Sequence, residues 1–348
     1  MRVDLFDFDL PERLIAQRPA VPRDAARLLH LPRDAAAAEH AVRDLPDLLR
    51  PGDLLVFNDT RVIPARLYGR RASGGKIEAL LLGPTDSGAW TAMVRGVAKL
   101  RLDARLTFEG GLSAAVTAIG GDGTVVLDFG LADSAVLAAL RAHGHMPLPP
   151  YIRGGRDDAH DRHDYQTVVA RHDGAIAAPT AALHFTEALL ARLRDAGVAT
   201  AAVTLHVGIG TFQPVRVDDT DAHVMHIEHG ELGPDTITAI DTCRARGGRV
   251  IAVGTTSLRV LEAVAAHHDG ALVPWRGDID LFITPGFRFR AVDLLMTNFH
   301  LPRSTLFMLV SAFAGLQRMQ ALYADAIARD FRFYSYGDAS LLERREAV

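Results

Sequence analysis

Short apolar runs alternate with amphipathic segments along most of the chain. Consecutive apolar positions over a few residues are typical of strands that are buried on both faces of a parallel sheet. Such strands are expected over residues 54–57, 198–207, 249–253, 281–283 and 292–296. Helices bounded by capping residues or glycine are expected over residues 186–197, 233–247 and 304–315, and from residue 255 onward. This alternation predicts a large Rossmann-like α/β domain.

The stretch between Arg66 and Phe129 has a different pattern of short strand-like runs and glycine-containing turns. Runs of strand character are separated by Gly-Gly, Asp-Ser-Gly and Gly-Asp-Gly turns, as in a small antiparallel barrel. Strands are expected over residues 76–82, 89–95, 105–109, 112–119 and 124–129, with a helix over 133–144. We therefore predict a discontinuous α/β catalytic domain, residues 1–65 plus 149–348, with an inserted β-barrel domain at residues 66–148.

The composition is that of a globular protein in a reducing compartment, as the following counts indicate. The 348 residues are 49% hydrophobic and 23% charged, as in an ordinary globular protein. Cys243 is the single cysteine, which excludes an intramolecular disulfide and favours a reducing compartment, so we expect the cytoplasm. The first residues lack the pattern of a signal peptide, and the apolar run at 304–315 is too short to span a bilayer. We expect no contact with a membrane.

The formal net charge of −4 argues against a protein that is coated in positive charge. Contact with nucleic acid would therefore need a local basic patch. The predicted barrel carries such a set, namely Arg66, Arg70, Arg71, Lys76, Arg95, Lys99, Arg101 and Arg105. Both a solvated charged face and a nucleic-acid surface are open interpretations of this set.

Polar side chains gather where the predicted strands end. After the strand at 198–207, Gly208 and Gly210 let the backbone turn sharply and approach a ligand. The polar groups beside these glycines are His206, Thr211 and Gln213. The groups after the other strands are Asn58, Asp59 and Arg61, then Thr297, Asn298 and His300, and finally Tyr336 and Asp338. The carboxyl ends of parallel strands meet at one edge, so these groups predict a ligand crevice there, with plain turn formation as the alternative.

A helix start after the strand at 249–253 is a candidate anion site. Thr255 and Thr256 open that helix and Arg259 follows, and unpaired N–H groups at a helix start favour a carboxylate or phosphate. Simple helix capping is the alternative. His184 also precedes a predicted helix, where either a structural or a catalytic role is open.

Three histidines and a glutamate lie close together at His223, His226, Glu228 and His229. Their spacing suggests a zinc site, and a metal-dependent hydrolase built on the three histidines is the alternative function. The His-Glu-x-x-His order of such sites is missing, so substrate contacts or proton transfer are favoured for these residues. A non-catalytic RNA-binding module is a further alternative.

Several long blocks resemble the S-adenosylmethionine:tRNA ribosyltransferase-isomerases of queuosine biosynthesis. The matching blocks, which include Asn58-Asp59-Thr60-Arg61, are residues 52–66, 144–151, 177–185, 203–216, 250–261, 297–305 and 334–339. They run in the order of the family and span nearly the whole chain. Ala182, where glycine is usual, and His229, where tyrosine is frequent, depart from the family pattern.

The resemblance implies both the fold and the reaction. It implies an α/β domain interrupted by a small barrel. It also implies transfer of the ribosyl part of S-adenosylmethionine to 7-aminomethyl-7-deazaguanine at the wobble position of tRNA, with isomerisation to epoxyqueuosine and release of adenine and methionine. S-adenosylmethionine would be a co-substrate, with no permanently bound cofactor and no metal. We expect a monomer.

The chemistry of this reaction suggests roles for the residues at the predicted edge. A base has to remove a proton from the ribosyl carbon next to the sulfonium, and His206 or His184 is expected to do so. Adenine needs a proton donor as it leaves, for which the candidates are Asp59, Glu228 and Asp338. The methionine carboxylate would suit Thr255, Thr256 and Arg259. The predicted substrate-binding set also includes Thr180, and Arg61, Arg66 and Arg303 are expected to contact tRNA phosphates.

Overall fold

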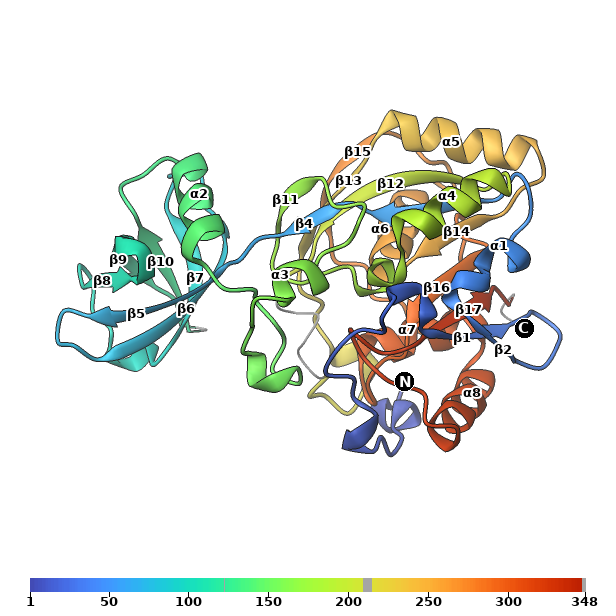
Figure 1. Cartoon of the computed structure of the whole chain (residues 1–348), viewed down its shortest axis with the longest axis horizontal. Helices are drawn as coiled ribbons and strands as arrows, with labels where there is room; N and C mark the ends of the chain where they lie inside the picture. The colour runs from blue at the N-terminus through green and yellow to red at the C-terminus, as the bar shows by residue number, and fades with distance from the viewer. Residues whose placement is uncertain (122, 209–214, 346–348) are drawn as a thin grey trace. The chain divides into compact units, whose positions relative to one another are not determined.

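The computed structural model describes residues 1–121, 123–208 and 215–345 (Figure 1). The chain divides into two compact units. The first comprises Met1–Thr60, Gln166–His172 and Ala178–Val348, and the second comprises Arg61–Tyr165 and Asp173–Ala177. The domain boundaries at 66 and 148 stay a prediction, while the α/β class with an additional small β-barrel is confirmed.

The first unit is built on a nine-stranded sheet. Its strand order is β15 (Trp275–Ile279), β13 (Glu228–Leu232), β12 (Ala199–His206), β3 (Leu54–Asn58), β14 (Val250–Val253), β16 (Leu294–Asn298), β17 (Ala339–Glu343), β1 (Arg27–Leu31) and β2 (Ala38–Ala41). The four central strands β12, β3, β14 and β16 are parallel to one another. All positions of β3, β14 and β16 are buried, which explains why these strands were readable as continuous apolar runs.

Helices cover both faces of this sheet. One core, here called the α6-side core, packs β3, β12 and β14 against apolar residues of α5 (Pro234–Ala245), α6 (Thr255–His267), α7 (Thr305–Ala314) and α8 (Leu316–Ala328). The opposite α4-side core packs the sheet against α1 (Leu45–Leu48), η8 (Thr180–His184) and α4 (Glu187–Asp195). The predicted cap is present, since Thr186 accepts the backbone N–H of Leu189 at the start of α4, and Ser304 caps α7 in the same way.

Two strand predictions need correction. Residues 281–283 form no strand; the strand in this region is β15, whose alternating exposure fits the outer edge of the sheet. The strand expected at 292–296 lies two residues later, at Leu294–Asn298. The outer strands β1, β2, β13 and β17 were not predicted, because neighbouring strands and helices rather than local periodicity decide their pairing.

The second unit contains a closed barrel. Its strands run in the order β10 (Thr124–Asp128), β7 (Trp90–Arg95), β6 (Lys76–Pro84), β5 (Arg66–Arg71), β8 (Arg105–Phe108) and β9 (Ser113–Ile119). Alternate residues of β6 and β7 point into the barrel and are buried. The helices α2 (Asp133–His143) and α3 (Asp161–Asp164) follow, and β4 (Thr60–Val62) pairs with β11 (His172–Ala175).

The remaining short helices are of the 3₁₀ type: η1 (Val3–Phe6), η2 (Glu12–Leu14), η3 (Arg23–Ala25), η4 (Val42–Asp44), η5 (Val97–Lys99), η6 (Glu109–Gly111), η7 (Arg153–Gly155) and η10 (Thr220–Ala222). Within the described ranges, no helix is both long enough and apolar enough to cross a membrane. The most apolar helix, α7, instead contributes to the α6-side core.

A buried ion pair joins the amino ends of β3 and β14. Both oxygens of Asp53 accept hydrogen bonds from Arg249, including one of 2.6 Å from Nη2, and Asp53 is 1% exposed. Burial alone would raise the pKa of Asp53, but the hydrogen bonds from Arg249 and from backbone N–H groups outweigh it and lower this pKa below its ordinary value of 3.8. The ionised carboxylate therefore stabilises the folded state.

We expect Asp53→Asn to lower the free energy of unfolding by about 3 kcal/mol at neutral pH, because it leaves the guanidinium without its carboxylate. A carboxyl group whose pKa is lower in the folded than in the unfolded protein stabilises the folded state at pH values above its unfolded pKa. The wild type should therefore lose the stabilisation by Asp53 as the pH falls below 3.8. Urea unfolding at several pH values measures both effects. The exposed Asp241→Asn variant is the control; equal losses in the two variants would contradict the prediction.

Candidate active site

The carboxyl ends of the central strands bring most of the predicted site residues to one edge of the large sheet. β3 lies between β12 and β14, so the chain order reverses across β3. Such a reversal opens a crevice beyond the carboxyl ends, which is where open α/β sheets bind ligands. The antiparallel strands β13 and β17 start at the same edge, with Glu228 and Ala339. The predicted gathering of polar groups at this edge is therefore present.

Asn58 holds the two strands β3 and β12 together at this edge. Its Nδ2 donates to the carbonyl oxygen of Leu205 at 2.9 Å, and its Oδ1 accepts from the backbone N–H groups of Leu205 and Thr60. Asp59 follows, and its Oδ1 accepts from the Thr204 hydroxyl at 2.8 Å. These bonds fix where β3 ends and therefore where the next polar residues lie.

His206 is the last residue of β12, and its ring contacts a hydroxyl. His206 Nδ1 lies 2.8 Å from Thr60 Oγ1, which lies 3.5 Å from the carbonyl oxygen of His172. We assign the proton of the neutral ring to Nδ1, so that Nδ1–H donates to Thr60 Oγ1 and the Thr60 hydroxyl donates to the carbonyl oxygen of His172. The lone pair of His206 Nε2 then remains available to accept a proton. Burial and then the rings of His229 and His172 lower the pKa of His206 below 6.5, so the ring is neutral near pH 7.

His184, the other predicted base, ends η8 and is buried. Asn298 Nδ2 lies 3.1 Å from His184 Nε2 and 3.0 Å from the carbonyl oxygen of Tyr334. An amide nitrogen only donates, so Nε2 accepts and the ring proton lies on Nδ1. Burial lowers the pKa of His184 to about 4. The ring is therefore neutral, but Asn298 already occupies the lone pair that a base would use.

Further polar side chains lie at the carboxyl end of β16 and at the start of α6, which follows β14. Thr297 Oγ1 lies 3.0 Å from His300 Nε2, and burial lowers the pKa of His300 to about 3. Thr255 is buried at the start of α6, directly after Gly254 with φ +91°. Thr256 Oγ1 and Asn298 Oδ1 are buried and have no hydrogen-bond partner among the described residues. Unsatisfied polar atoms of this kind are what a polar ligand would use.

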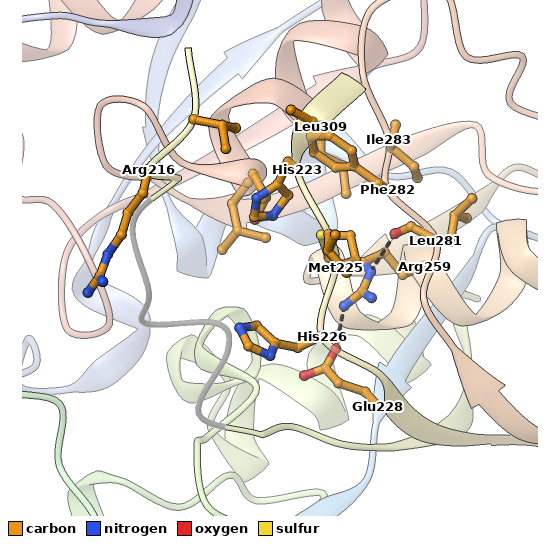
Figure 2. A pocket seen from close by; sticks show the side chains of 15 residues that line it. Arg216, His223, Met225, His226, Glu228, Arg259, Leu281, Phe282, Ile283 and Leu309 are labelled. Carbon is orange, nitrogen blue, oxygen red and sulfur yellow. Dashed lines mark hydrogen bonds and ion pairs between the residues drawn. The ribbon is translucent and has the colours of Figure 1, made fainter. Parts of the chain in front are cut away.

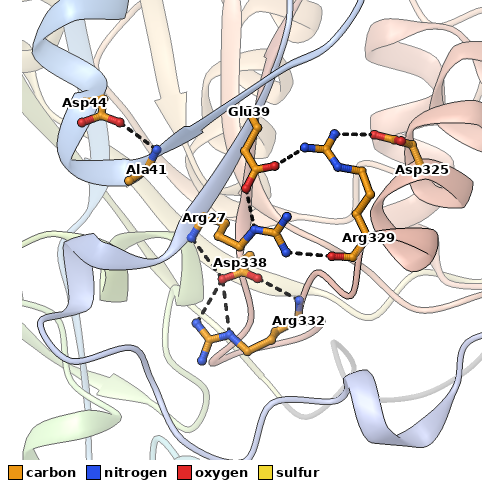
Figure 3. A network of polar contacts seen from close by, with 8 residues as sticks. All are labelled: Arg27, Glu39, Ala41, Asp44, Asp325, Arg329, Arg332 and Asp338. Atoms are coloured by element: carbon orange, nitrogen blue, oxygen red, sulfur yellow. Dashed lines mark hydrogen bonds and ion pairs between the residues drawn. The ribbon is translucent and has the colours of Figure 1, made fainter.

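Asp338 belongs to a polar network that joins the segments beside β17 and β1 (Figure 3). Its Oδ1 accepts from the backbone N–H of Arg27 at 3.1 Å, and its Oδ2 accepts from that of Arg332 at 2.8 Å. The guanidinium of Arg332 also donates to Oδ1, with Nη2 at 3.0 Å. In this structure the carboxylate holds chain segments together. Tyr336, two residues earlier, is buried.

Glu228 and Arg259 form a buried ion pair in the wall of a pocket of about 310 Å³ (Figure 2). Arg259 Nη1 donates to Glu228 Oε2, and Nε donates to the carbonyl oxygen of Leu281 at 3.2 Å. Glu228 Oε1 also accepts the backbone N–H of Gly208 at 3.1 Å. Arg259 Nη2 is buried and has no hydrogen-bond partner in the described part of the chain. This nitrogen can bind an anion that enters the pocket.

The other walls of this pocket are mostly apolar. They come from the segment before β13, from the residues after β15 and from α7, and include Met225, Phe282, Ile283, Leu306 and Leu309. Figure 2 shows His223 above Met225, with Arg259 beside Met225 and Glu228 below them. A cationic nitrogen at one end of an apolar pocket suits a ligand that has an anionic end and an apolar chain.

The predicted residues point to two different faces of the sheet. Val203 and Leu205 of β12 pack in the α6-side core, so His206 points to the other face because side chains alternate along a strand. Glu228 shares the face of Leu232, which packs in the α6-side core. The pocket with Arg259 thus lies on the α6 side of the edge, and His206 lies on the α4 side.

The three histidines of the metal hypothesis are not arranged as one ligand set. His223 lines the pocket with its ring 5.1 Å from that of Phe282, and His226 lines it as well. His229 instead faces Asp278, with Nδ1 3.3 Å from Oδ1. Within residues 1–121, 123–208 and 215–345, no three His, Cys, Asp or Glu side chains are placed to hold one metal ion. The metal-dependent hydrolase is therefore not favoured.

Gly210, Thr211 and Gln213 lie outside the described residues. Thr180 begins η8, and Arg61 belongs to the second unit, where its Nε is 3.7 Å from Asp173 Oδ1.

Sequence reasoning missed two contributors to the site. Thr60 was read only as part of a turn, although its place directly after Asn58 and Asp59 was a usable signal. Phe282 was read as a strand residue, because a short apolar run does not reveal whether it pairs with a strand or lines a pocket.

Comparison with known proteins identifies relatives over nearly the full length. The family described as "Queuosine biosynthesis protein" matches residues 3–342. The chain is 59% identical over 346 residues to the S-adenosylmethionine:tRNA ribosyltransferase-isomerase of Rhodospirillum rubrum, covering 99% of each chain. It is 59% identical over 349 residues to the protein of the same name from Sphingopyxis alaskensis, covering 100% of this chain and 98% of the relative.

A solved structure is also similar. The crystal structure of S-adenosylmethionine tRNA ribosyltransferase from Thermotoga maritima matches with a TM-score of 0.56 and 37% sequence identity. The match covers 97% of this chain and 99% of that chain.

Proposed function

The chain belongs to the queuosine biosynthesis protein family, and on that premise we propose that it is an S-adenosylmethionine:tRNA ribosyltransferase-isomerase. It transfers the ribosyl moiety of S-adenosylmethionine to 7-aminomethyl-7-deazaguanine at the tRNA wobble position and isomerises it. The products are epoxyqueuosine tRNA, adenine and methionine. The observation that carries this proposal is the match to the family over residues 3–342, which includes the polar edge and the pocket.

The pocket beside α6 is our proposed site for the methionine part of S-adenosylmethionine. Arg259 Nη2 would donate to the carboxylate, which supplies the partner that this buried nitrogen lacks among the described residues. Met225, Phe282 and Leu309 would contact the methylene groups and the S-methyl group. Glu228 would hold the guanidinium in place. Thr255 and Thr256 are close in sequence to Arg259, and their contact with the same ligand stays a prediction.

His206 is our proposed base for the proton on the ribosyl carbon next to the sulfonium. Its assigned tautomer leaves Nε2 as an acceptor, whereas the corresponding lone pair of His184 accepts from Asn298. Because His206 and the pocket lie on opposite faces, the bound molecule would extend over the ends of β12 and β3. Gly208 lies two residues after His206, and its lack of a side chain leaves room for this passage.

Asp59 is our proposed partner for the departing adenine. Glu228 and Asp338 direct their oxygens toward arginine and backbone N–H donors. Asp59 Oδ1 binds Thr204, while Oδ2 lies 3.7 Å from His172 Nε2. A histidine beside a carboxylate can pass a proton to a purine nitrogen.

The family name also implies tRNA as the second substrate. Unstacking of the wobble base would expose it to the pocket, and arginine and lysine side chains would hold the phosphates. The cations of the barrel, together with Arg61 and Arg303, remain our predicted phosphate contacts. A monomer without a permanently bound cofactor also remains a prediction.

A mass-spectrometric assay tests the proposed function. Purified protein would be incubated with S-adenosylmethionine and a tRNA that carries 7-aminomethyl-7-deazaguanine, with and without chelator. We expect equal amounts of adenine, methionine and epoxyqueuosine tRNA, at the same rate in both samples. Intact tRNA binding without any product would overturn the proposal and favour an RNA-binding module. Turnover of other substrates that is lost on chelation would favour the metal-dependent hydrolase.

A further inference from the structure

We propose that residues 223–227, here called the mouth segment, receive the unstacked wobble base of the tRNA on their outer side. The inference rests on the proposed function and adds the surface that the second substrate uses. The mouth segment lies between η10 (Thr220–Ala222) and the start of β13. Its first residue has extended backbone angles, φ −81° and ψ 130°. Along the segment, His223 and Met225 are half-buried, whereas Val224, His226 and Ile227 are exposed.

The inner side of the mouth segment is part of the pocket wall. His223 and Met225 are half-buried, and both line the pocket (Figure 2). Burial, followed by the charge of His226, lowers the pKa of His223, so this inner ring is neutral near pH 7. The inner side therefore contributes an uncharged wall to the proposed methionine site.

The outer side exposes two large apolar side chains. Val224 is 83% exposed although it also lines the pocket, and Ile227 is 66% exposed. Val224 therefore stands at the pocket mouth, with one surface toward the pocket and most of its surface toward solvent. Isolated exposed apolar residues need no explanation, but one at the mouth of a substrate pocket with a second three positions later indicates a contact surface.

The wobble base is the occupant that fits this surface. Its amine must reach the ribosyl carbon bonded to the sulfonium, which leaves the pocket when the methionine part is bound inside, so the base has to arrive beside the pocket mouth. The face of a purine-like base is flat and apolar, and enzymes that act on unstacked bases hold them between aromatic or apolar side chains. Val224 and Ile227 supply such contacts.

The cation beside the mouth segment also suits a nucleotide. Arg216 lines the same pocket, and Figure 2 shows its guanidinium directed away from the apolar wall. His226, within the segment, is exposed. A cation next to an apolar contact favours a base that carries a phosphate over an uncharged partner surface.

A double variant, Val224→Ser with Ile227→Ser, tests the inference. We expect the apparent Michaelis constant for the modified tRNA to rise about tenfold, since contacts to one unstacked base contribute a binding free energy of about that size. The dissociation constant of S-adenosylmethionine, measured by calorimetry, should stay within about twofold, because Arg259, His223, Met225 and Phe282 are unchanged and Val224 turns most of its surface to solvent. Two controls are available: Val21→Ser alters a valine that is 92% exposed elsewhere in the same unit, and Val224→Ile with Ile227→Val keeps the surface apolar.

The outcomes separate this inference from the proposed function. Wild-type protein that makes no epoxyqueuosine tRNA would contradict the function itself. Active wild-type protein whose double variant keeps the wild-type tRNA constant would overturn only the mouth-segment inference. It would also be overturned if the variant lost S-adenosylmethionine binding as strongly as tRNA binding, or if light scattering showed a wild-type dimer that the variant converts to a monomer. A dimer that the variant converts to a monomer would mean that the outer side of the mouth segment is an interface between two copies of the chain.

Discussion

His206→Ala should slow single-turnover adenine release by about 10²–10⁴-fold, the usual contribution of a positioned base. The expectation follows from the neutral ring, whose Nδ1 contacts Thr60 and whose Nε2 remains an acceptor. Substrate binding should change little, because no other role is assigned to this ring. Rapid-quench measurement of adenine, with enzyme in excess over tRNA, separates the chemical step from product release.

Thr60 provides the matched control for this prediction. Thr60→Val removes the hydroxyl that orients His206 and should slow the same step about tenfold, whereas Thr60→Ser keeps the hydroxyl and should keep the rate. His184→Ala should slow the step less than His206→Ala does, because the His184 lone pair accepts from Asn298. The opposite ranking of the two histidine variants would move the base to His184, and unchanged chemistry in both would contradict a histidine base.

The pH dependence of the reaction gives an independent check. A base acts only when unprotonated, and the pKa of His206 lies below 6.5 because of burial and its neighbouring rings. The rate should therefore rise with pH through a value below 6.5 and then stay level over the neutral range. Loss of this acid limb in His206→Ala, at a low residual rate, would identify the titrating group.

Arg259→Ala should raise the apparent constant for S-adenosylmethionine about 100-fold, the scale for truncating one partner of a buried charge pair at a binding site. The guanidinium carries two functions, since Nη1 holds Glu228 and Nη2 is available to the ligand carboxylate. The apparent constant for tRNA should change far less. Isothermal titration with S-adenosylmethionine and steady-state assays with varied tRNA measure the two constants separately.

Two further variants distinguish ligand contact from support of the fold. Arg259→Lys keeps a positive charge beside Glu228 but loses the forked geometry, so it should fold normally and still bind S-adenosylmethionine weakly. Glu228→Gln removes the carboxylate and keeps the guanidinium, so it should weaken binding by less than Arg259→Ala does. A larger effect of Arg259→Ala on tRNA than on S-adenosylmethionine would place this arginine on the RNA side.

The roles of the individual residues at the edge could be predicted only in part. Asn58 was a reasonable ligand contact, and His184 and Asp338 were reasonable catalytic groups, since each follows or precedes a predicted element. In the structure, Asn58 bonds to backbone N–H and C=O groups, Asp338 bonds to backbone N–H groups and the Arg332 guanidinium, and His184 bonds to Asn298. A polar residue at a strand end can bind the protein or a ligand, and its type does not distinguish the two.

The sequence by itself determined the buried parallel strands, the capped helices and the barrel texture. These features depend on neighbours a few positions away, such as the run Val250–Val253 or the cap of α4 by Thr186. It also determined that polar groups follow the strands, and its long matching blocks indicated the family.

Only the tertiary structure decided which of these groups meet. The ion pair of Glu228 with Arg259 joins residues of β13 and α6, and the contact of His206 with Thr60 joins residues that are 146 positions apart. Their placement on opposite faces of one edge depends on strand order and register, which long-range packing sets. A shift of one residue in β12 would turn His206 to the other face, because side chains alternate along a strand.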